Sequence, residues 1–166
     1  MDRASIIAEM KLIFTDMPYG VNHTLRVLNN ADAIMTGEHV GEKTQEIISL
    51  AAILHDIGAA AAQQKYNSIE GRFQEIEGPA IARAILVRAS VRGEGIDRVC
   101  FIVGNHHTPS KIDGLDFQIL WEADLLDSLE FGERSRNGEE LMLEIQKNFK
   151  TATGKNLALQ RCGYEQ

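Results

Sequence analysis

Cysteine is nearly absent from this sequence, and no Cys-x-x-C pair occurs in it. The two cysteines, Cys100 and Cys162, stand alone, and a reduced, cytoplasmic protein is the simplest interpretation. No stretch approaches the roughly 20 apolar residues that cross a bilayer. The first residues, MDRASIIAEMKLIF, include acidic side chains and lack a small-residue cleavage site, so we expect neither a signal peptide nor a membrane partner.

Aromatic residues are also few, at 6% of the chain, whereas alanine, isoleucine and leucine are plentiful. This balance favours helices over sheets. Apolar residues recur with a helical period nearly throughout, and no alternating strand pattern of useful length occurs. Nothing repeats and no low-complexity linker divides the 166 residues. We therefore predict one all-α domain, 1–166, folded as a bundle of about six to seven helices.

Helix-breaking and capping residues set the ends of the expected helices. Asn22 is the expected N-cap of the second helix, Gly58 the terminator of the third, and Pro79 suits the first turn of the fourth. Residues 59–77 show no clear pattern, the stretch TPSKIDG at 108–114 predicts a loop, and a short turn is expected near the end. The expected helices cover residues 3–16, 22–37, 42–57, 79–89, 97–106, 117–131 and 139–150.

Positive charge is in short supply as well. The chain has 17 lysines and arginines against 24 acidic residues, which gives a net charge of −7, and no basic block occurs. Extended nucleic-acid binding needs a cationic surface that displaces counterions, so this composition argues against it. A small phosphorylated ligand stays compatible with the charge, because a bound cation can supply local positive charge.

A His-Asp pair ends an apolar helix, ISLAAILHDIG. A charged Asp56 beside His55 at that position is costly unless it is paired or bound to a cation. His23 begins a helix after a glycine-containing turn, and Asp124 lies on an otherwise apolar helix face. Two imidazoles and two carboxylates suit Fe, Mn, Co, Ni or Zn. Each residue alone also has a simpler interpretation, such as helix capping for His23 or an ion pair with Arg26 for Asp124.

The order His23, His55-Asp56, Asp124 resembles the HD-domain superfamily of metal-dependent phosphohydrolases. The segments HTLRVLNNA, AAILHDIG and EADLLDSL match the contexts of its ligands, and the resemblance covers about residues 20–131. It implies a helical bundle with a central metal ion held by these four residues. It also implies hydrolysis of phosphate esters, often in nucleotides.

Two departures from the family pattern limit what we expect for the number of metal ions and for the substrate. Members with two or three metals usually add a histidine between the HD pair and a later His-His pair. Here the corresponding region reads QEIEGPAIA, with Glu75 and Glu77 available instead, so we predict one divalent transition-metal ion. The segment GNHHTPSKIDGLD is similar to the His-His segment of cyclic-di-GMP phosphodiesterases, but their Gly-Tyr-Pro motif is absent.

The expected mechanism is hydrolysis by a metal-activated water. Asp56 is a candidate proton acceptor, and His106 or His107 is a candidate to orient the water or protonate the leaving oxygen, with one of that pair as plausible in a structural role. Four cationic side chains are candidates for contacts to the substrate phosphate, although each of the last three is more often an ordinary surface charge and we expect only one of them to contact it: Arg26, Lys65, Arg72 and Lys111.

We therefore predict a metal-dependent phosphohydrolase that acts on a small phosphorylated compound, with a nucleotide as the favoured class. The alternative is a non-catalytic, metal-containing nucleotide sensor or binding module. A helical interaction protein with a structural His/Asp set is the least favoured option. The sequence leaves the oligomeric state open, with a homodimer among the options.

Overall fold

The structure is a computed structural model that describes residues 3–131 and 138–164. Helices make up nearly all of these residues. These residues contain no strand, which confirms the all-α prediction, with more helices than expected. The elements are α1 (Arg3–Ile13), α2 (Pro18–Gly37), α3 (Glu42–Leu54), α4 (Ala59–Tyr66), α5 (Gly71–Arg88), α6 (Gly93–Val103), the short 3-10 helix η1 (Pro109–Lys111), α7 (Leu115–Phe131), α8 (Gly138–Asn148) and α9 (Ala152–Arg161).

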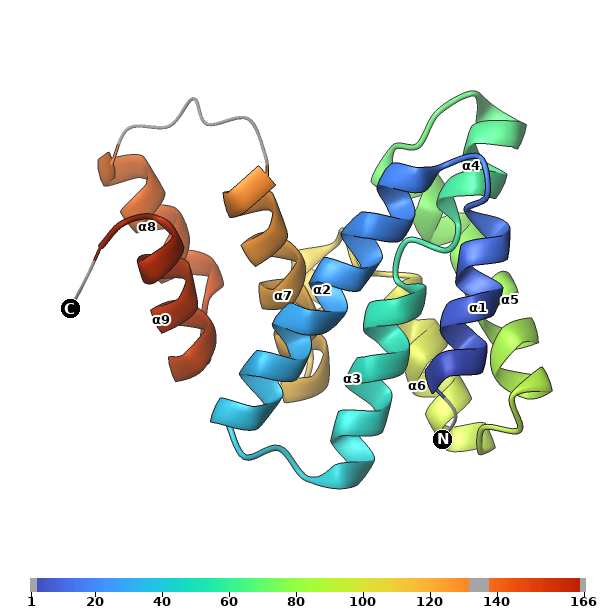
Figure 1. Cartoon of the computed structure of the whole chain (residues 1–166), viewed down its shortest axis with the longest axis horizontal. Coiled ribbons are helices and arrows are strands. Elements are labelled where there is room, and N and C mark those ends of the chain that lie inside the picture. Colours follow the sequence, from blue (N-terminus) through green and yellow to red (C-terminus); the bar gives the residue numbers. More distant parts are fainter. Residues whose placement is uncertain (1–2, 132–137, 165–166) are drawn as a thin grey trace.

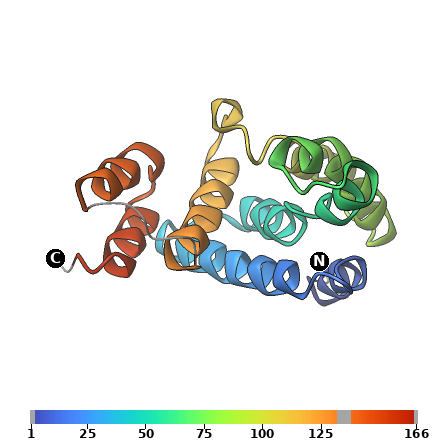
Figure 2. The same ribbon diagram turned by 90° about the horizontal axis from the view of Figure 1, so that it is seen from above.

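The helix α3 lies at the centre of the bundle. It contacts α1, α2, α6 and α7, and every residue from 48 to 54 is buried, because a helix surrounded on all sides has no face left for polar side chains. The long helix α2 packs along both α3 and α7 (Figure 1). Seen from above, α8 and α9 lie beside α7 at one end, and α4 to α6 lie at the other (Figure 2).

Two predicted helix starts are wrong. The helix α2 begins at Pro18, a residue suited to the first helical position, so Asn22 lies inside the helix and does not cap it. The helix α5 begins at Gly71 and contains Pro79 in its interior. Proline removes a helical hydrogen bond there, but α5 packs against both α4 and α6, and that packing outweighs the local preference.

The ends of α3 and α6 also differ from the prediction, and both differences concern the site. The helix α3 ends at Leu54, so His55 and Asp56 lie in the turn that follows. The helix α6 spans Gly93–Val103 and not 97–106, so His106 and His107 lie in a turn as well. Neighbouring side chains on a helix point about 100° apart, but in a turn this constraint is relaxed. Both residues of each pair can therefore face the same site.

The remaining elements fill segments that the pattern left undefined. The stretch 59–77 forms α4 and the first part of α5, and the expected short turn near the end is the helix α9. Thr151 caps α9 by accepting a hydrogen bond from the backbone N–H of Gly154 at 2.9 Å, and the buried carboxylate of Glu122 accepts from the backbone N–H groups of Lys150 and Thr151. No helix among the described residues is long and apolar enough to cross a membrane, and the cytoplasmic location stays a prediction.

Candidate metal centre

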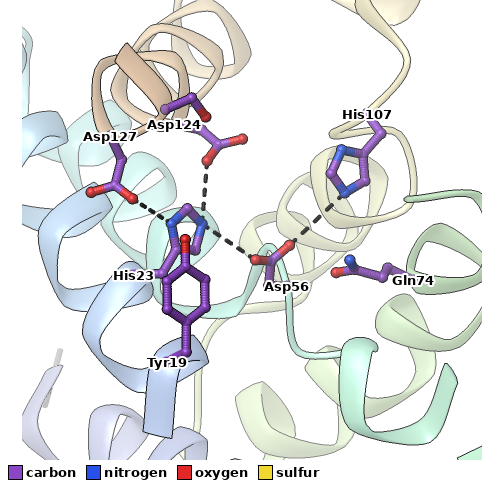
Figure 3. Close-up of a pocket in the computed structure, with 8 residues that line it drawn as sticks. Tyr19, His23, Asp56, Gln74, His107, Asp124 and Asp127 are labelled. Carbon is purple, nitrogen blue, oxygen red and sulfur yellow. Dashed lines mark hydrogen bonds and ion pairs between the residues drawn. The ribbon is translucent and has the colours of Figure 1, made fainter. Parts of the chain in front are cut away.

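Residues from three helices and from the turns that follow two others surround a cavity of about 250 Å³. His23 comes from α2, the His55-Asp56 pair from the turn after α3, the His106-His107 pair from the turn after α6, and Asp124 from α7. Figure 3 shows His23 and Asp56 facing each other across this space, with Asp124 above them. The residues that line the cavity are Tyr19, His23, Asp56, Gln74, His107, Asp124, Asp127 and Ser128.

The four predicted metal ligands lie together. The Nε2 atom of His23 is 3.1 Å from Nε2 of His55, 3.3 Å from Oδ2 of Asp56 and 3.3 Å from Oδ1 of Asp124. Ligand atoms bonded at about 2.1 Å to one cation lie about 3.0 Å apart in an octahedron and about 3.4 Å apart in a tetrahedron. The observed separations have this size, so His23, His55 and Asp56 fit one transition-metal ion, and Asp124 lies 3.3 Å from His23 at the edge of this group.

Hydrogen bonds outside the cluster turn the histidine rings towards its centre. Nδ1 of His55 donates to the carbonyl oxygen of Ala52 at 2.9 Å, since that oxygen can only accept. Nδ1 of His23 lies 2.7 Å from Oδ2 of Asp127 and donates to that carboxylate. Neutral imidazoles in this arrangement present their Nε2 lone pairs to each other, and two lone pairs 3.1 Å apart repel unless a proton or a cation lies between them.

A second group of possible ligands shares Asp56. Its Oδ2 faces His23 and His55, whereas its Oδ1 lies 3.1 Å from Nε2 of His106 and 3.9 Å from Nε2 of His107. Asp56, His106 and His107 also lie close enough to hold a cation. His106 is buried and oriented like His55, with Nδ1 donating to the carbonyl oxygen of Val103 at 2.7 Å. The prediction of a single ion stays a prediction, for which the test is a measured metal content.

The acidic residues named as substitutes for a missing histidine have other partners. Glu75 accepts hydrogen bonds from the backbone N–H of His107 and the hydroxyl of Thr108, both at 2.9 Å. It therefore holds the turn that carries the His-His pair. Glu77 accepts from Lys65 and from the hydroxyl of Tyr66 at the surface. Both carboxylates therefore have partners other than Asp56.

The charges of the cluster favour a cation. Burial alone would raise the pKa of Asp56, but His55 and hydrogen bonds from His106 and His23 hold that pKa well below its usual range. Burial opposes the charged form of His23, yet hydrogen bonds to Asp124 and Asp56 outweigh it and raise the pKa of His23 to about 11. A site that retains a proton so strongly has excess negative charge, and a metal ion competes with the proton for the same atoms.

Asp127 is a site residue that the sequence reasoning did not select as a ligand or support. Its side chain is only 2% exposed, it accepts from His23, and it forms two hydrogen bonds with the guanidinium of Arg26, at 2.5 and 3.0 Å. Its position one helical turn after Asp124 was the available signal, because residues three apart share a helix face. Arg26, a predicted substrate contact, is thus held on Asp127 and does not line the cavity.

The other predicted phosphate contacts also lie outside the cavity lining. Lys65 pairs with Glu77, and Arg72 pairs with Glu70 while its guanidinium lies over the ring of Phe73. Lys111 is exposed in η1. The structure does not bring these side chains together around the metal ligands, and their role in substrate binding stays a prediction.

An all-helical bundle with imidazoles and carboxylates converging on a cation site defines a class of helical metalloproteins. The family model of the HD domain matches residues 20–147, and the chain belongs to the HD-domain family. A crystal structure of a predicted HD superfamily hydrolase from an uncultured Thermotogales bacterium matches with a TM-score of 0.70 and 23% identity, over 96% of this chain and 84% of that one. None of the curated proteins matches the sequence.

These comparisons confirm the predicted family and the all-α fold. They also support a hydrolase in general terms, since the HD domain is a family of metal-binding hydrolases. The family match stops at residue 147, and the prediction of a single domain over 1–166 stays a prediction.

Proposed function

We propose that this protein is a metal-dependent phosphohydrolase that acts on a small phosphorylated compound, with a nucleotide as the favoured substrate class. One observation carries the proposal. Three of the four predicted ligands, His23, Asp56 and Asp124, line a cavity of about 250 Å³, and His55 is buried beside them. Structural metal sites are closed by protein ligands, whereas catalytic sites keep a position for water or substrate, and an open cavity is the second kind.

The metal ion, when bound, supplies an activated water and polarises a phosphoryl oxygen. The side chains of the chain itself divide the remaining tasks. Asp56 has one oxygen on each ligand group, so it fixes their relative position. His106 is buried, and its Nε2 lies 3.1 Å from Oδ1 of Asp56. His107 lines the cavity and is the member of the pair that reaches a substrate or its leaving oxygen.

Tyr19 supports a nucleotide as the substrate. Its side chain is 70% exposed at the rim of the cavity, and its ring is parallel to that of His23, with an interplanar angle of 7°. A cavity of about 250 Å³ is small for a whole ligand, so part of the substrate extends beyond it. A base that emerges at the rim meets the flat face of Tyr19, and such stacking is worth about 1–3 kcal/mol per base.

The charge of the lining favours a single phosphate group. The side chains that line the cavity include three carboxylates and, in the part of the chain that the structure describes, no lysine or arginine. The cation therefore balances most of the substrate charge. A monophosphate suits this arrangement better than a triphosphate, which needs several cationic partners.

A hydrolysis screen tests the proposal. The purified protein is loaded with Mn²⁺, Co²⁺ or Fe²⁺ and offered nucleoside monophosphates, nucleoside triphosphates and sugar phosphates. We expect release of phosphate from at least one monophosphate, loss of activity with a chelator and recovery after metal is restored. A loaded site that hydrolyses nothing, yet binds a nucleotide at micromolar concentration, would overturn the enzyme and support the sensor.

A further inference from the structure

Gln74 has a buried amide oxygen without a partner. The residue lies on α5, is 7% exposed and lines the same cavity as the candidate metal ligands. Its Nε2 donates to the carbonyl oxygen of Ile69 at 2.7 Å. Its Oε1 accepts no hydrogen bond, a condition that only Thr24 Oγ1 shares among the buried side-chain atoms of the described residues. Figure 3 shows the amide pointing towards Asp56 from the side of α5.

The orientation of this amide is fixed. The carbonyl oxygen of Ile69 only accepts hydrogen bonds, so the nitrogen of Gln74 must face it and the oxygen must face away. The surrounding backbone is tightly packed. A Cβ atom on Gly58 would lie 2.4 Å from the carbonyl oxygen of Gln74, and one on Gly71 would lie 2.4 Å from the ring of His107. The segment that carries Gln74 therefore has little room to move the acceptor elsewhere.

A buried acceptor without a donor costs about 1–3 kcal/mol, so it is retained where a bound group satisfies it. The neighbours of Gln74 in the cavity do not supply that donor. Asp56, Asp124 and Asp127 are carboxylates, and the lining side chains that carry donors form no hydrogen bond with Oε1 of Gln74, namely Tyr19, His23, His107 and Ser128. The missing donor must therefore come from a molecule that binds in the cavity.

We infer that Oε1 of Gln74 accepts a hydrogen bond from an O–H group held at the metal centre, which makes Gln74 a specificity-determining residue. The inference rests on the proposed function, because it assumes that phosphate binds beside Asp56. A neutral amide oxygen does not repel a phosphate as a carboxylate would, but it favours an oxygen that carries a proton. The donor is either a hydroxyl of the ligand itself or a water molecule held next to it.

Inorganic phosphate and sulfate separate these two donors. At neutral pH, hydrogenphosphate carries an O–H group, whereas sulfate is a dianion of similar shape without one. Both anions are titrated calorimetrically into the Mn²⁺-loaded protein, as wild type and as Gln74→Met, which keeps the size of the side chain and removes the acceptor. Gln63→Met, an exposed position on α4, is the matched control.

If the ligand is the donor, the ratio of phosphate to sulfate affinity falls about 3- to 10-fold in Gln74→Met, the factor for one neutral hydrogen bond, and stays at the wild-type value in Gln63→Met. If water is the donor, the ratio is unchanged but kcat falls by a similar factor at constant KM. Either result supports the inference. Gln74→Asn, which withdraws the amide by one methylene, replaces Gln74→Met if that variant does not fold.

Four results would overturn the inference. Unchanged anion affinities together with an unchanged kcat would mean that Oε1 accepts a hydrogen bond neither from the ligand nor from a water molecule used in the reaction. A loss of Mn²⁺ affinity in Gln74→Met would make Gln74 a metal ligand and not an acceptor for O–H. If the wild type, fully loaded with Mn²⁺, binds neither anion, the proposed function fails together with the inference. Equal binding of both anions by all variants, with hydrolysis intact, leaves the function standing and removes only the role of Gln74.

Discussion

Asp127 accepts the Nδ1 proton of His23 at 2.7 Å and is itself held by the guanidinium of Arg26. The acceptor fixes the tautomer of His23 and aims Nε2 at the cluster. Asp127 thus orients a predicted metal ligand without being one of the predicted ligands itself. These hydrogen bonds link Arg26 and His23 on α2 to Asp127 on α7. They lie next to the predicted metal ligands that the two helices carry.

The first prediction concerns this support. Asp127→Asn should lower the affinity for Mn²⁺ or Co²⁺ by about 10- to 100-fold while the fold is kept, because the amide keeps the size of the side chain but disturbs both partners. Competition with a fluorescent chelator measures the affinity. Asp32→Asn, which removes an ion pair with Arg3, is the control, and it should bind metal normally. Wild-type affinity in Asp127→Asn would refute the supporting role.

The second prediction separates metal binding from folding. His55→Ala or Asp124→Ala should abolish metal binding and leave the helical far-UV spectrum largely intact, since the core of a chain of this length folds without a metal. His39 is exposed and has a φ of 52°, which Asn tolerates, so His39→Asn serves as a control that retains metal. Unfolding of both ligand variants would instead indicate a structural metal.

The third prediction concerns the number of ions. We expect about one tightly bound transition-metal ion per chain, and we expect His106→Ala to keep it, because the first ligand group does not include His106. Elemental analysis of both proteins after dialysis gives the count. Two ions per chain in the wild type, falling to one in His106→Ala, would show that both groups sharing Asp56 are occupied.

The fourth prediction concerns the rim of the cavity. Tyr19→Ala should raise KM for a nucleoside monophosphate by about 5-fold or more, as expected for the loss of one stacked base. The KM for a sugar phosphate should stay unchanged, because that substrate has no ring to stack. Steady-state kinetics with the two substrates measures the difference. An equal rise for both would mean that Tyr19 positions His23 and does not contact the base.

The fifth prediction concerns stability at low pH. Arg98 bonds to both Asp113 and Asp116, and its hydrogen bonds lower the pKa of each, in Asp116 against the opposing effect of burial. A lowered pKa in the folded state adds stability above the unfolded value of about 4, and that stability is lost as pH falls through the folded value. Arg98→Gln should therefore be less stable than wild type at pH 7, and the difference should shrink below about pH 4.

Urea unfolding at pH 7, 5 and 3 measures this pH dependence. Arg83→Gln, which removes an exposed ion pair with Asp97, is the control and should change stability little at any of these values, since exposed pairs contribute little. A constant stability difference between Arg98→Gln and wild type across the series would show that Arg98 acts through packing and not through the two carboxylates.

The sequence was sufficient to predict the family and to select four side chains that lie together, because their order and their local segments resemble those of the HD-domain family. It could not identify their supports. Arg26 shares a helix flank with His23, but periodicity does not say which carboxylate it meets, and the partner is Asp127 and not Asp124. Gln74 escaped notice because its significance depends on burial and on a hydrogen bond that occupies its nitrogen, neither of which a pattern of polar residues reveals.

The helix ends were harder to predict for a related reason. The first half of α5 is polar, and its helix formation depends on packing against α4 and α6, so the local pattern carried little signal. Pro79 was placed at a helix start, as its preference suggests. Tertiary contacts can override such a preference, and they are not visible in the neighbouring residues.

His55 and His106 are built in the same way. Each follows the last turn of a helix and donates its Nδ1 proton to the backbone carbonyl three residues earlier, Ala52 in one case and Val103 in the other. Since the acceptor belongs to the backbone of the same segment, a single short stretch of chain supplies both the imidazole and the hydrogen bond that orients it. His23, by contrast, needs a carboxylate 104 residues away. A histidine of the first kind, placed after the end of a buried helix in a designed protein, would therefore be oriented without any further residue.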